Sequence, residues 1–326
     1  MNKNIYRSIL KDEMNGFTKL RKAQGLRYMC GTVLRHLDVY LVENAIAEKK
    51  LTPDLVDNWV DEKFYSYNPN TLRSYMASYT QFAKYLNTID IEAYIPITPL
   101  SHQSYVPYIF IESEIEAIFH AADNLKSDSN PKAELWVPML LRLLYGCGLR
   151  MAEALSLTIT DIDLVGRVLF IKNAKGNKDR FVPMDQSLTE VLKQYCIAIL
   201  RENNGRKLLF ESSVKNRISN QIARRWFHRV LCEARIDLLP APEDFVGRTR
   251  NICLNCFRHT FAVASLRNQN INGIDNYRIT PHLSTYLGHA KLEGTQKYLH
   301  MTAEVVEDIH KTTTSYCEGF FPEVPQ

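Results

Sequence analysis

A proline-bearing segment near the end of the first third divides this chain and limits the folds open to it. Pro96, Pro99 and Pro107 follow one another within a short stretch. Proline lacks a backbone N–H donor and interrupts helices, so the stretch predicts a connection between two folded parts. The 326 residues are enough for a separate hydrophobic core on each side. We therefore expect domains at residues 1–100 and 108–326, with residues 101–107 as the linker.

The first domain carries the pattern of a small helical fold. Apolar side chains recur at helical spacing over residues 28–47, and further helices are expected over residues 5–22 and from Asn70 onward. Thr52 and Pro53 open another helix, with Thr52 as the N-cap and Pro53 in the first turn. We interpret the aromatic residues of the helix after Asn70 as core packing rather than as a platform for DNA bases.

The second domain combines helices with one β-hairpin. Ser113 and Glu116 form a capping box that begins a helix. Two short β-rich runs flank a Gly176-Asn177 turn and predict the hairpin, with Lys175 at its tip. The fold class is therefore mainly α with a small β-sheet. The predicted strands are 168–171 and 180–183, and the predicted helices are 134–145, 187–201, 217–235 and 257–266.

Charge and hydropathy exclude several classes of protein. A net charge of +4 and a pI near 8.5 agree with a nucleic-acid binder without requiring one. The first residues lack the apolar run of a secretory signal, and no stretch approaches the roughly 18 apolar residues that span a bilayer. We therefore expect a cytoplasmic protein without a membrane partner.

The cysteines indicate neither disulfides nor a metal site. Their number, seven, is odd and their spacing is scattered, which is typical of reduced thiols. Cys253 and Cys256 form a CxxC motif with His259 nearby, but a structural zinc site normally needs a second ligand pair at regular spacing. We expect no metal ligand and no cofactor.

Five short motifs of the second domain hold side chains suited to phosphate chemistry. Arginine can fork onto non-bridging phosphate oxygens, and histidine can donate to one. A tyrosine hydroxyl is a potential nucleophile, and one that attacks a DNA phosphate would hold the broken strand covalently. The motifs are Gly148–Glu153 with Arg150, Lys175–Arg180, Arg258-His259-Thr260, Leu287-Gly288-His289 and, last, Tyr298.

In this order, the motifs resemble those of the tyrosine recombinase (phage integrase) family over residues 108–301. The resemblance implies a two-domain clamp that closes around duplex DNA, with a helical core-binding domain followed by the tyrosine recombinase catalytic domain. It also implies site-specific DNA recombination through a 3′-phosphotyrosyl intermediate. Neither a metal nor a nucleotide is needed, because the covalent bond stores the energy for rejoining the strand.

The resemblance carries catalytic roles onto matching residues. Tyr298 is expected to attack the scissile phosphate, while Arg150 and Arg258 stabilise the charge of the transition state. His289 is expected to donate to the phosphate or to help deprotonate Tyr298. Three further roles follow: Lys175 protonates the leaving 5′ oxygen, Asn255 orients the phosphate, and Glu153 supports the site from one helical turn after Arg150.

Asn255 departs from the family pattern, which usually has histidine three residues before the second arginine. An asparagine amide can donate a hydrogen bond to a phosphate oxygen or to Tyr298. It cannot titrate, so it cannot act as a general acid or base. Any proton transfer must therefore use other side chains.

A basic stretch predicts DNA contacts away from the catalytic motifs. Gln221, Arg225 and Arg229 are spaced to share one helical face, while Trp226 and Val230 should face the core. Arginine and glutamine are the side chains that read guanine and adenine edges in a major groove, although a merely solvated charged face is the alternative. The expected DNA-binding residues are Lys215, Arg217, Gln221, Arg224, Arg225 and Arg229.

Other functions stay open on the sequence alone. A type IB topoisomerase shares this chemistry but acts as a monomer that relaxes supercoils, and Asn255 is compatible with a DNA-binding protein that has lost catalysis. A metal-dependent nuclease would need a carboxylate cluster that is missing near the histidines. We favour a recombinase of a mobile element, acting in integration, excision or transposition. It is expected to bind a double-stranded DNA target site as a homo-tetramer, through a tail with apolar residues Val305, Val306, Ile309, Phe320 and Phe321.

Overall fold

A computed structural model describes most of the chain as two compact units. Residues 6–97 belong to the first unit and residues 107–299 to the second, within the described ranges. The predicted linker lies outside these ranges except for Pro107, and so does the tail after Leu299. The described ranges are 6–25, 31–67, 69–97, 107–127, 130–172, 179–202, 205–212, 216–236, 252–271, 276–289 and 291–299.

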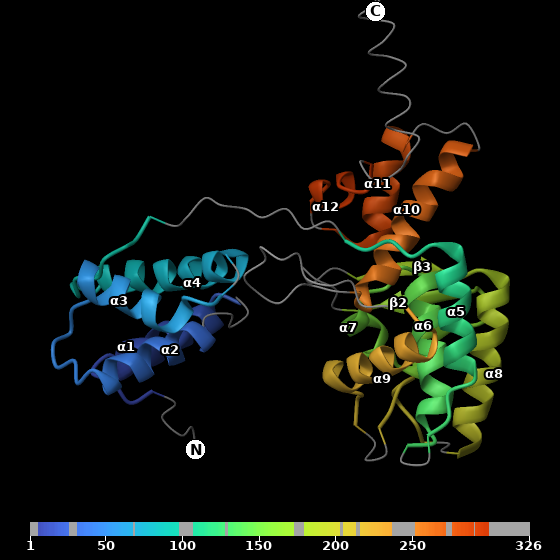
Figure 1. The fold of residues 1–326 in the computed structure, drawn as a ribbon, viewed down its shortest axis with the longest axis horizontal. Helices are drawn as coiled ribbons and strands as arrows, with labels where there is room; N and C mark the ends of the chain where they lie inside the picture. The colour runs from blue at the N-terminus through green and yellow to red at the C-terminus, as the bar shows by residue number, and fades with distance from the viewer. Residues whose placement is uncertain are drawn as a thin grey trace, which may run out of the picture. The chain divides into compact units, whose positions relative to one another are not determined.

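The described part of the first unit contains four helices (Figure 1). The Thr52 hydroxyl accepts a hydrogen bond of 3.3 Å from the Leu55 N–H and caps α3, as predicted. Tyr79 and Phe82 of the helix after Asn70 are buried in the core, which confirms core packing for these two aromatic residues. The helices are α1 (Lys11–Ala23), α2 (Gly31–Glu43), α3 (Pro53–Phe64) and α4 (Pro69–Asn87).

Helix α1 begins at Lys11 rather than at residue 5. The buried carboxylate of Asp38 accepts hydrogen bonds from the backbone N–H groups of Arg7 and Ser8, at distances from 2.8 to 3.0 Å. These backbone groups are satisfied by a side chain of α2, so residues 6–10 adopt turns instead of a further helical turn.

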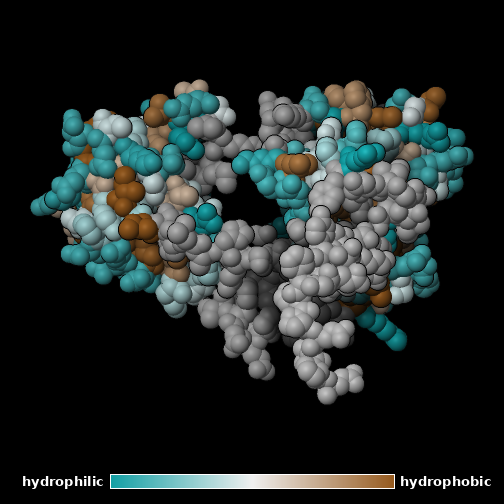
Figure 2. All heavy atoms as spheres, turned by 90° about the horizontal axis from the view of Figure 1, so that it is seen from above, coloured by the Kyte–Doolittle hydropathy of each residue, from teal (hydrophilic) through white to brown (hydrophobic). Residues whose placement is uncertain are grey.

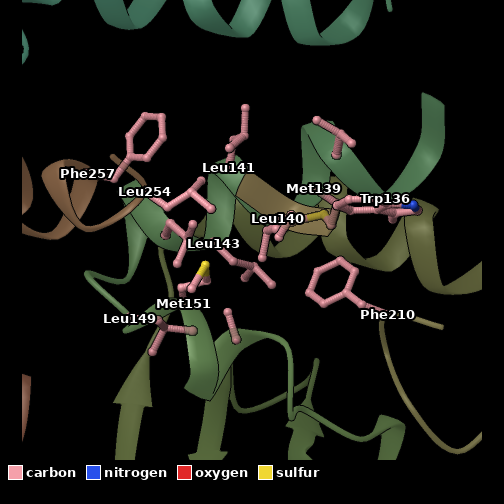
Figure 3. Packing of buried hydrophobic residues seen from close by; sticks show 14 of the residues in the cluster. Trp136, Met139, Leu140, Leu141, Leu143, Leu149, Met151, Phe210, Leu254 and Phe257 are labelled. Atoms are coloured by element: carbon pink, nitrogen blue, oxygen red, sulfur yellow. The ribbon is translucent and has the colours of Figure 1, made fainter. Parts of the chain in front are cut away.

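The second unit is built around α6 (Ala133–Gly146), which is buried on nearly every side. Figure 3 shows Trp136, Met139 and Leu140 of this helix among side chains from other elements, including Phe210 and Phe257. Such a helix is hydrophobic all round because other helices enclose it. The helices packed against it are α5 (Glu112–Asp123), α8 (Gln186–Glu202), α9 (Asn220–Glu233) and α10 (Asn255–Ile271).

Side-chain hydrogen bonds place the starts of α5 and α9 away from the predicted ones. The N-cap of helix α5 is Ile111, two residues before the predicted Ser113, because the Glu114 carboxylate reaches back to the Ile111 N–H at 3.0 Å. Helix α9 begins at Asn220 instead of residue 217, because the Ser219 hydroxyl accepts a hydrogen bond of 3.2 Å from Ile222 N–H. Both starts follow the side chain that satisfies a free N–H of the first turn.

The predicted hairpin strands form, and a third strand joins them. The sheet has the order β1-β2-β3, and both neighbouring pairs are antiparallel. Strand β1 has only two residues, too few for a periodic pattern, so the sequence did not indicate it. The turn at Gly176-Asn177 and Lys175 lie outside the described residues. The strands are β1 (Ile162–Asp163), β2 (Val168–Ile171) and β3 (Arg180–Pro183).

The last described helices pack together beside the sheet. Helix α10 packs on α11 (Asn276–Leu287), and α11 packs on the short α12 (Glu293–Gln296). In Figure 1 these three helices lie next to one another. Their apolar side chains, among them Ala262, Leu266 and Leu287, form a small cluster that also holds Tyr298. The protein is thus mainly helical with a small sheet, as predicted.

The surface drawn in Figure 2 is mostly hydrophilic, with some hydrophobic residues among the polar ones. Some exposed apolar surface is ordinary for folded proteins. Within the described residues, no helix combines the length and the hydropathy that crossing a membrane requires.

Candidate active site

Three arginines converge on the carboxyl end of α11. Arg150 directly precedes α7 (Met151–Ala154), Arg180 begins β3, and Arg258 lies in the first turn of α10. A helix end exposes carbonyl groups without intrahelical partners and carries a partial negative charge, so it can hold cationic side chains. The hydrogen bonds run from Arg180 Nε to Tyr286 O (2.8 Å), Arg258 Nη2 to Leu287 O (2.6 Å) and Arg150 Nη2 to Gly288 O (3.0 Å).

Glu153 is the carboxylate between two of these arginines. Its side chain is 7% exposed and pairs with Arg180 Nη2 and Arg150 Nη1, each at 2.8 Å. Burial alone would raise the pKa of Glu153, but Arg180 and Arg150 outweigh it and lower the pKa to about 2. The residue is therefore ionised at neutral pH. One carboxylate faces three guanidinium groups, so the cluster keeps positive charge for an anion.

Replacing Glu153 by glutamine should destabilise the second unit in a pH-dependent way. The folded pKa lies near 2 against an ordinary 4.5, so the ionised form contributes stability above about pH 4.5 and loses it as pH falls towards 2. We expect a loss of roughly 3 kcal/mol at pH 7, because two partly buried arginines lose their counter-charge. Urea unfolding followed by circular dichroism at pH 7 and pH 3 measures it.

A surface ion pair provides the control for this measurement. Glu43 pairs with Lys63 at 2.9 Å with its side chain 54% exposed, so Glu43→Gln should change stability by less than about 1 kcal/mol. A Glu153→Gln loss that is as large at pH 3 as at pH 7 would contradict the assigned ion pairing.

Two glycines shape the backbone around the arginines. Gly148 has φ +57°, and a Cβ there would lie 2.5 Å from the ring of Phe261. Gly288 has φ +66°, and a Cβ there would lie 3.1 Å from Arg180 Nη1. Both positions therefore need glycine for conformation and for space. The Gly148 carbonyl also accepts a hydrogen bond of 2.8 Å from Arg258 Nη1, so Arg258 bridges the α6–α7 turn and the end of α11.

Arg258 is the most buried of the three arginines, and its burial affects its pKa and its interaction with an anion. It is only 4% exposed. Burial and the nearby Arg150 lower its pKa to about 10, so it stays protonated at neutral pH. A charged donor held in a dry site interacts more strongly with an anion than it would in water.

Tyr298 lies beside this cluster with its hydroxyl bound to a histidine. The residue is 1% exposed, and His259 Nδ1 lies 2.7 Å from the hydroxyl oxygen. Burial raises the pKa of Tyr298 to about 12, while Arg258 and Arg150 act in the opposite direction. The Lys297 ammonium also lies 4.9 Å from the centre of the Tyr298 ring. The phenol is thus protonated at neutral pH and has a hydrogen-bond partner that can take its proton.

Both histidines of the site are neutral at physiological pH. Burial, followed by the charge of Lys297, lowers the pKa of His259 to about 4. Burial, followed by Arg258 and Arg150, lowers the pKa of His289 to about 3. His289 does not contact the Tyr298 hydroxyl in this structure: its Nδ1 lies 2.6 Å from the Thr295 hydroxyl, which fixes the ring. Neutral imidazoles offer one donor and one acceptor nitrogen each.

The structure gathers most of the predicted catalytic residues. Arg150, Arg258, His289 and Tyr298 lie in one cluster, and Glu153 is paired with Arg150. Asn255 is the exposed first residue of α10, and Lys175 falls outside the described residues.

The predicted DNA-binding residues lie on the surface where the structure describes them. Arg217, Gln221, Arg224, Arg225 and Arg229 are exposed, and Val230 is buried. Two of the arginines also make contacts within the chain: Arg229 Nη2 donates to Lys126 O at 2.7 Å, and Arg217 Nη1 to the Ser156 hydroxyl at 2.7 Å. Lys215 lies outside the described residues.

Two site residues were not singled out from the sequence. Arg180 belonged to a recognised motif, but its bidentate pairing with Glu153, 27 positions earlier, becomes visible only in the fold. His259 belonged to the Arg258-His259-Thr260 motif but was given no role of its own, and its contact with Tyr298 spans 39 positions. No periodic signal links residues so far apart. Within the described ranges, no three His, Cys, Asp or Glu side chains gather to hold a metal ion.

Comparison with known proteins identifies similar chains. The sequence profile of the phage integrase family matches residues 109–304. Tyrosine recombinase XerC of Lacticaseibacillus casei is 32% identical over 234 residues, 70% of each chain. Tyrosine recombinase XerC of Listeria welshimeri is 27% identical over 274 residues, 81% of this chain and 83% of the relative. The XerH site-specific recombinase bound to palindromic difH substrate shares the fold, with a TM-score of 0.62 at 19% identity over 85% of this chain and 77% of that one.

Proposed function

Because the chain belongs to the phage integrase family of tyrosine recombinases, enzymes that cleave and rejoin DNA strands, we propose that it recombines specific DNA sites through a 3′-phosphotyrosyl intermediate. The observation that carries this proposal is the arrangement around Tyr298. Its hydroxyl has a proton acceptor in His259 at 2.7 Å and lies within the electrostatic reach of Arg150 and Arg258. One chain therefore supplies a nucleophile, a base and charge-stabilising donors.

In this proposal the arginines bind the scissile phosphate and stabilise the transition state. The pentacovalent arrangement places extra negative charge on the non-bridging oxygens, and Arg150 and Arg258 supply N–H donors that are already oriented. In the free protein some of these donors point at the carbonyls of Leu287 and Gly288. A phosphate would compete for them, and the preformed positive charge favours that exchange. Asn255 donates its amide to the phosphate.

Proton transfer is proposed to involve three side chains. As the Tyr298 oxygen bonds to phosphorus, its proton passes to Nδ1 of the neutral His259. His289, held by Thr295, donates to a non-bridging oxygen through its other nitrogen. Lys175 gives a proton to the departing 5′ oxygen. Rejoining runs the same transfers in reverse, so no external energy source is consumed.

Recovery of covalent protein–DNA complexes tests the function. Complexes trapped in cells and sequenced would reveal the cleaved site, and a nicked duplex of that sequence would then trap the intermediate in vitro. We expect a covalent band at one phosphate per strand, in the presence of EDTA. Relaxation of any supercoiled plasmid without site preference would indicate topoisomerase chemistry instead, and binding without a covalent band would indicate a protein that has lost catalysis.

Lys175→Ala should slow cleavage by roughly 10²–10⁴-fold, the usual contribution of a general acid. A substrate with a 5′-bridging phosphorothiolate should restore the rate, because sulfur leaves without needing a proton. Single-turnover cleavage of the two substrates measures both effects. Lys178→Ala is the matched control from the same segment, and rescue of that variant instead of Lys175→Ala would transfer the role to Lys178.

The exposed face of α9 is proposed to contact the DNA major groove. Gln221, Arg224 and Arg225 are exposed on this helix, and Arg229 lies on the same side. Arginine and glutamine can form bidentate contacts with guanine and adenine edges. Lys215 and Arg217 would bind phosphates before the helix, which gives affinity without sequence preference.

The active assembly is proposed to be a homo-tetramer on two DNA sites. The apolar residues Val305, Val306 and Ile309 and the pair Phe320-Phe321 support a tail that docks on a neighbouring subunit. Deleting residues 312–326 should leave binding to one site intact and weaken the two-site complex at least about tenfold. Gel-shift titration on one-site and two-site DNA measures this. Tetramers that form equally well without the tail would contradict its role.

The proposed biological setting is the movement of a genetic element by integration, excision or transposition. Resolution of chromosome dimers is the second candidate, and the likeness to recombinases named XerC favours it. The mapped cleavage sites separate the two settings. Sites that flank the gene itself would support a mobile element, whereas one site elsewhere in the chromosome would support dimer resolution.

A further inference from the structure

Two cysteines lie at the start of the helix that carries Asn255 and Arg258. Cys253 and Cys256 are three residues apart, and their sulfur atoms are separated by 3.8 Å. Cys253 is half-buried, whereas Cys256 is fully buried. Neither thiol has a part in the strand-transfer chemistry, although Asn255 stands between them and Arg258 follows two residues after the second.

We propose that Cys253 and Cys256 are a redox-active dithiol whose closure to a disulfide slows DNA cleavage, an inference that rests on the proposed function for its effect on activity. The pair would be modified by a low-molecular-weight disulfide of the glutathione type. Cys256 lies in the first turn of α10 and Cys253 lies two residues before the helix, so the bridge would form next to Asn255 and Arg258.

The local backbone can accommodate the bridge. The Cys256 N–H donates to the Cys253 carbonyl at 2.8 Å, which closes a four-residue turn. Such turns bring their end Cα atoms within about 7 Å, and disulfides usually span about 4.4–6.8 Å between Cα atoms. The distance between the two sulfur atoms must fall from 3.8 Å to the disulfide bond length of about 2.05 Å. Side-chain rotation and a small backbone shift at the helix start are enough for that.

The two thiols differ in the way that disulfide exchange requires. The hydrogen bond from Cys256, together with backbone N–H groups of Asn255 and Cys256, lowers the pKa of Cys253, against the opposing effect of burial. The bond to Cys253 and then burial raise the pKa of Cys256. A half-exposed thiolate next to a buried thiol is the usual arrangement of a reactive CxxC pair.

The exchange balances in two steps. The Cys253 thiolate attacks one sulfur of the small disulfide, forms a mixed disulfide and releases one thiol after protonation. Cys256 then loses its proton and attacks the Cys253 sulfur, which releases the second thiol. The protein loses two hydrogen atoms, and the small disulfide gains them.

The bridge should disturb the catalytic residues because the buried side of the helix start is fixed. Phe257 packs its ring on Phe110 and Phe227, at centroid distances of 5.1 and 5.6 Å. Figure 3 shows Leu254 and Phe257 directed into the core around α6. The shift therefore falls on Cys253, Asn255 and the first turn of α10. Arg258 donates to the carbonyls of Leu287 and Gly148, at 2.6 and 2.8 Å. A displacement of about 1 Å near a reacting group can lower the rate roughly 10²-fold.

The experiment compares the full-length protein after equilibration with dithiothreitol or with oxidised glutathione. In samples without DNA, the remaining thiols are alkylated and the protein is digested. The mass of the peptide that contains both cysteines is then measured by mass spectrometry. Covalent complex formation on the nicked target duplex is then timed. We expect oxidised protein to carry a disulfide within that peptide and to cleave at least about tenfold more slowly, with full recovery on reduction.

Three variants distinguish this pair from the other cysteines. Cys253→Ser and, as a second test in case serine perturbs folding, Cys253→Ala should cleave at the same rate in both buffers. Cys232→Ser removes an exposed cysteine from α9 and should remain as sensitive to oxidation as the unmodified protein. Oxidation sensitivity that survives both Cys253 variants overturns the proposal, as does a disulfide that leaves cleavage unchanged.

The mass measurement separates this inference from the function on which it rests. Absence of the disulfide in glutathione buffer overturns the redox pair even when the reduced protein cleaves normally. A protein that forms the disulfide but never cleaves, reduced or oxidised, overturns the proposed recombinase function and the switch with it.

Discussion

Tyr298→Phe should abolish the covalent protein–DNA complex while leaving DNA affinity within about threefold of the original. The substitution removes only the attacking oxygen, and without it no phosphotyrosyl bond can form. DNA binding is spread over many phosphate contacts, none of which requires this hydroxyl. Denaturing gels of the nicked duplex measure the covalent complex, and gel-shift titration measures the affinity.

The variant is expected to remain folded. Tyr298 is 1% exposed within an apolar cluster, and phenylalanine fills nearly the same volume. The lost hydrogen bond to His259 should change stability by about 1 kcal/mol. Tyr195→Phe is the matched control, because it removes another buried hydroxyl, bound to Leu209 O at 3.0 Å, far along the chain from Tyr298. That control should cleave normally, and a covalent band persisting in Tyr298→Phe would identify a different nucleophile.

The sequence predicted elements whose signals are local. Helix α6 has a continuous apolar run, and α3 has Thr52-Pro53 at its start. Strands β2 and β3 are short β-rich runs on either side of the predicted Gly176-Asn177 turn. All four elements form. The sequence predicted helix starts less well where a side chain outside the local window determines where the helix begins. The start of α1 depends on Asp38, some 30 residues later, and the start of α5 depends on which glutamate reaches a free N–H. Such competition between local and tertiary hydrogen bonds has no signature in a short window.

The site shows the same division between local and distant signals. The motifs indicated which residues suit phosphate chemistry, because their side-chain types and order carry that information. They did not indicate that the carbonyls at the end of α11 would hold three arginines, nor that His259 rather than His289 would meet the Tyr298 hydroxyl. These contacts depend on how α10, β3 and α11 meet, and backbone carbonyls as partners leave no trace in residue identity.

The arrangement of Arg258 leads to the second large expected effect. Arg258→Lys should lower the cleavage rate by roughly 10²–10³-fold, the usual loss when one oriented donor to a developing negative charge is removed. Lysine keeps the positive charge, but its single ammonium group cannot reproduce a planar fork that reaches Gly148 O through Nη1 and Leu287 O through Nη2. One buried carbonyl would lose its partner, which should also cost about 1–3 kcal/mol of stability.

Single-turnover cleavage at saturating protein isolates this effect from binding. Arg142→Lys is the matched control: Arg142 also makes a bidentate pair, with Asp123 at 2.7 and 2.8 Å, but on the outer side of α6. Its cleavage rate should stay within a few-fold of the original, while Arg258→Lys should lose rate with little change in DNA affinity. If charge alone stabilised the transition state, lysine would serve nearly as well as arginine. A near-normal rate in Arg258→Lys would therefore exclude the oriented guanidinium as the source of catalysis.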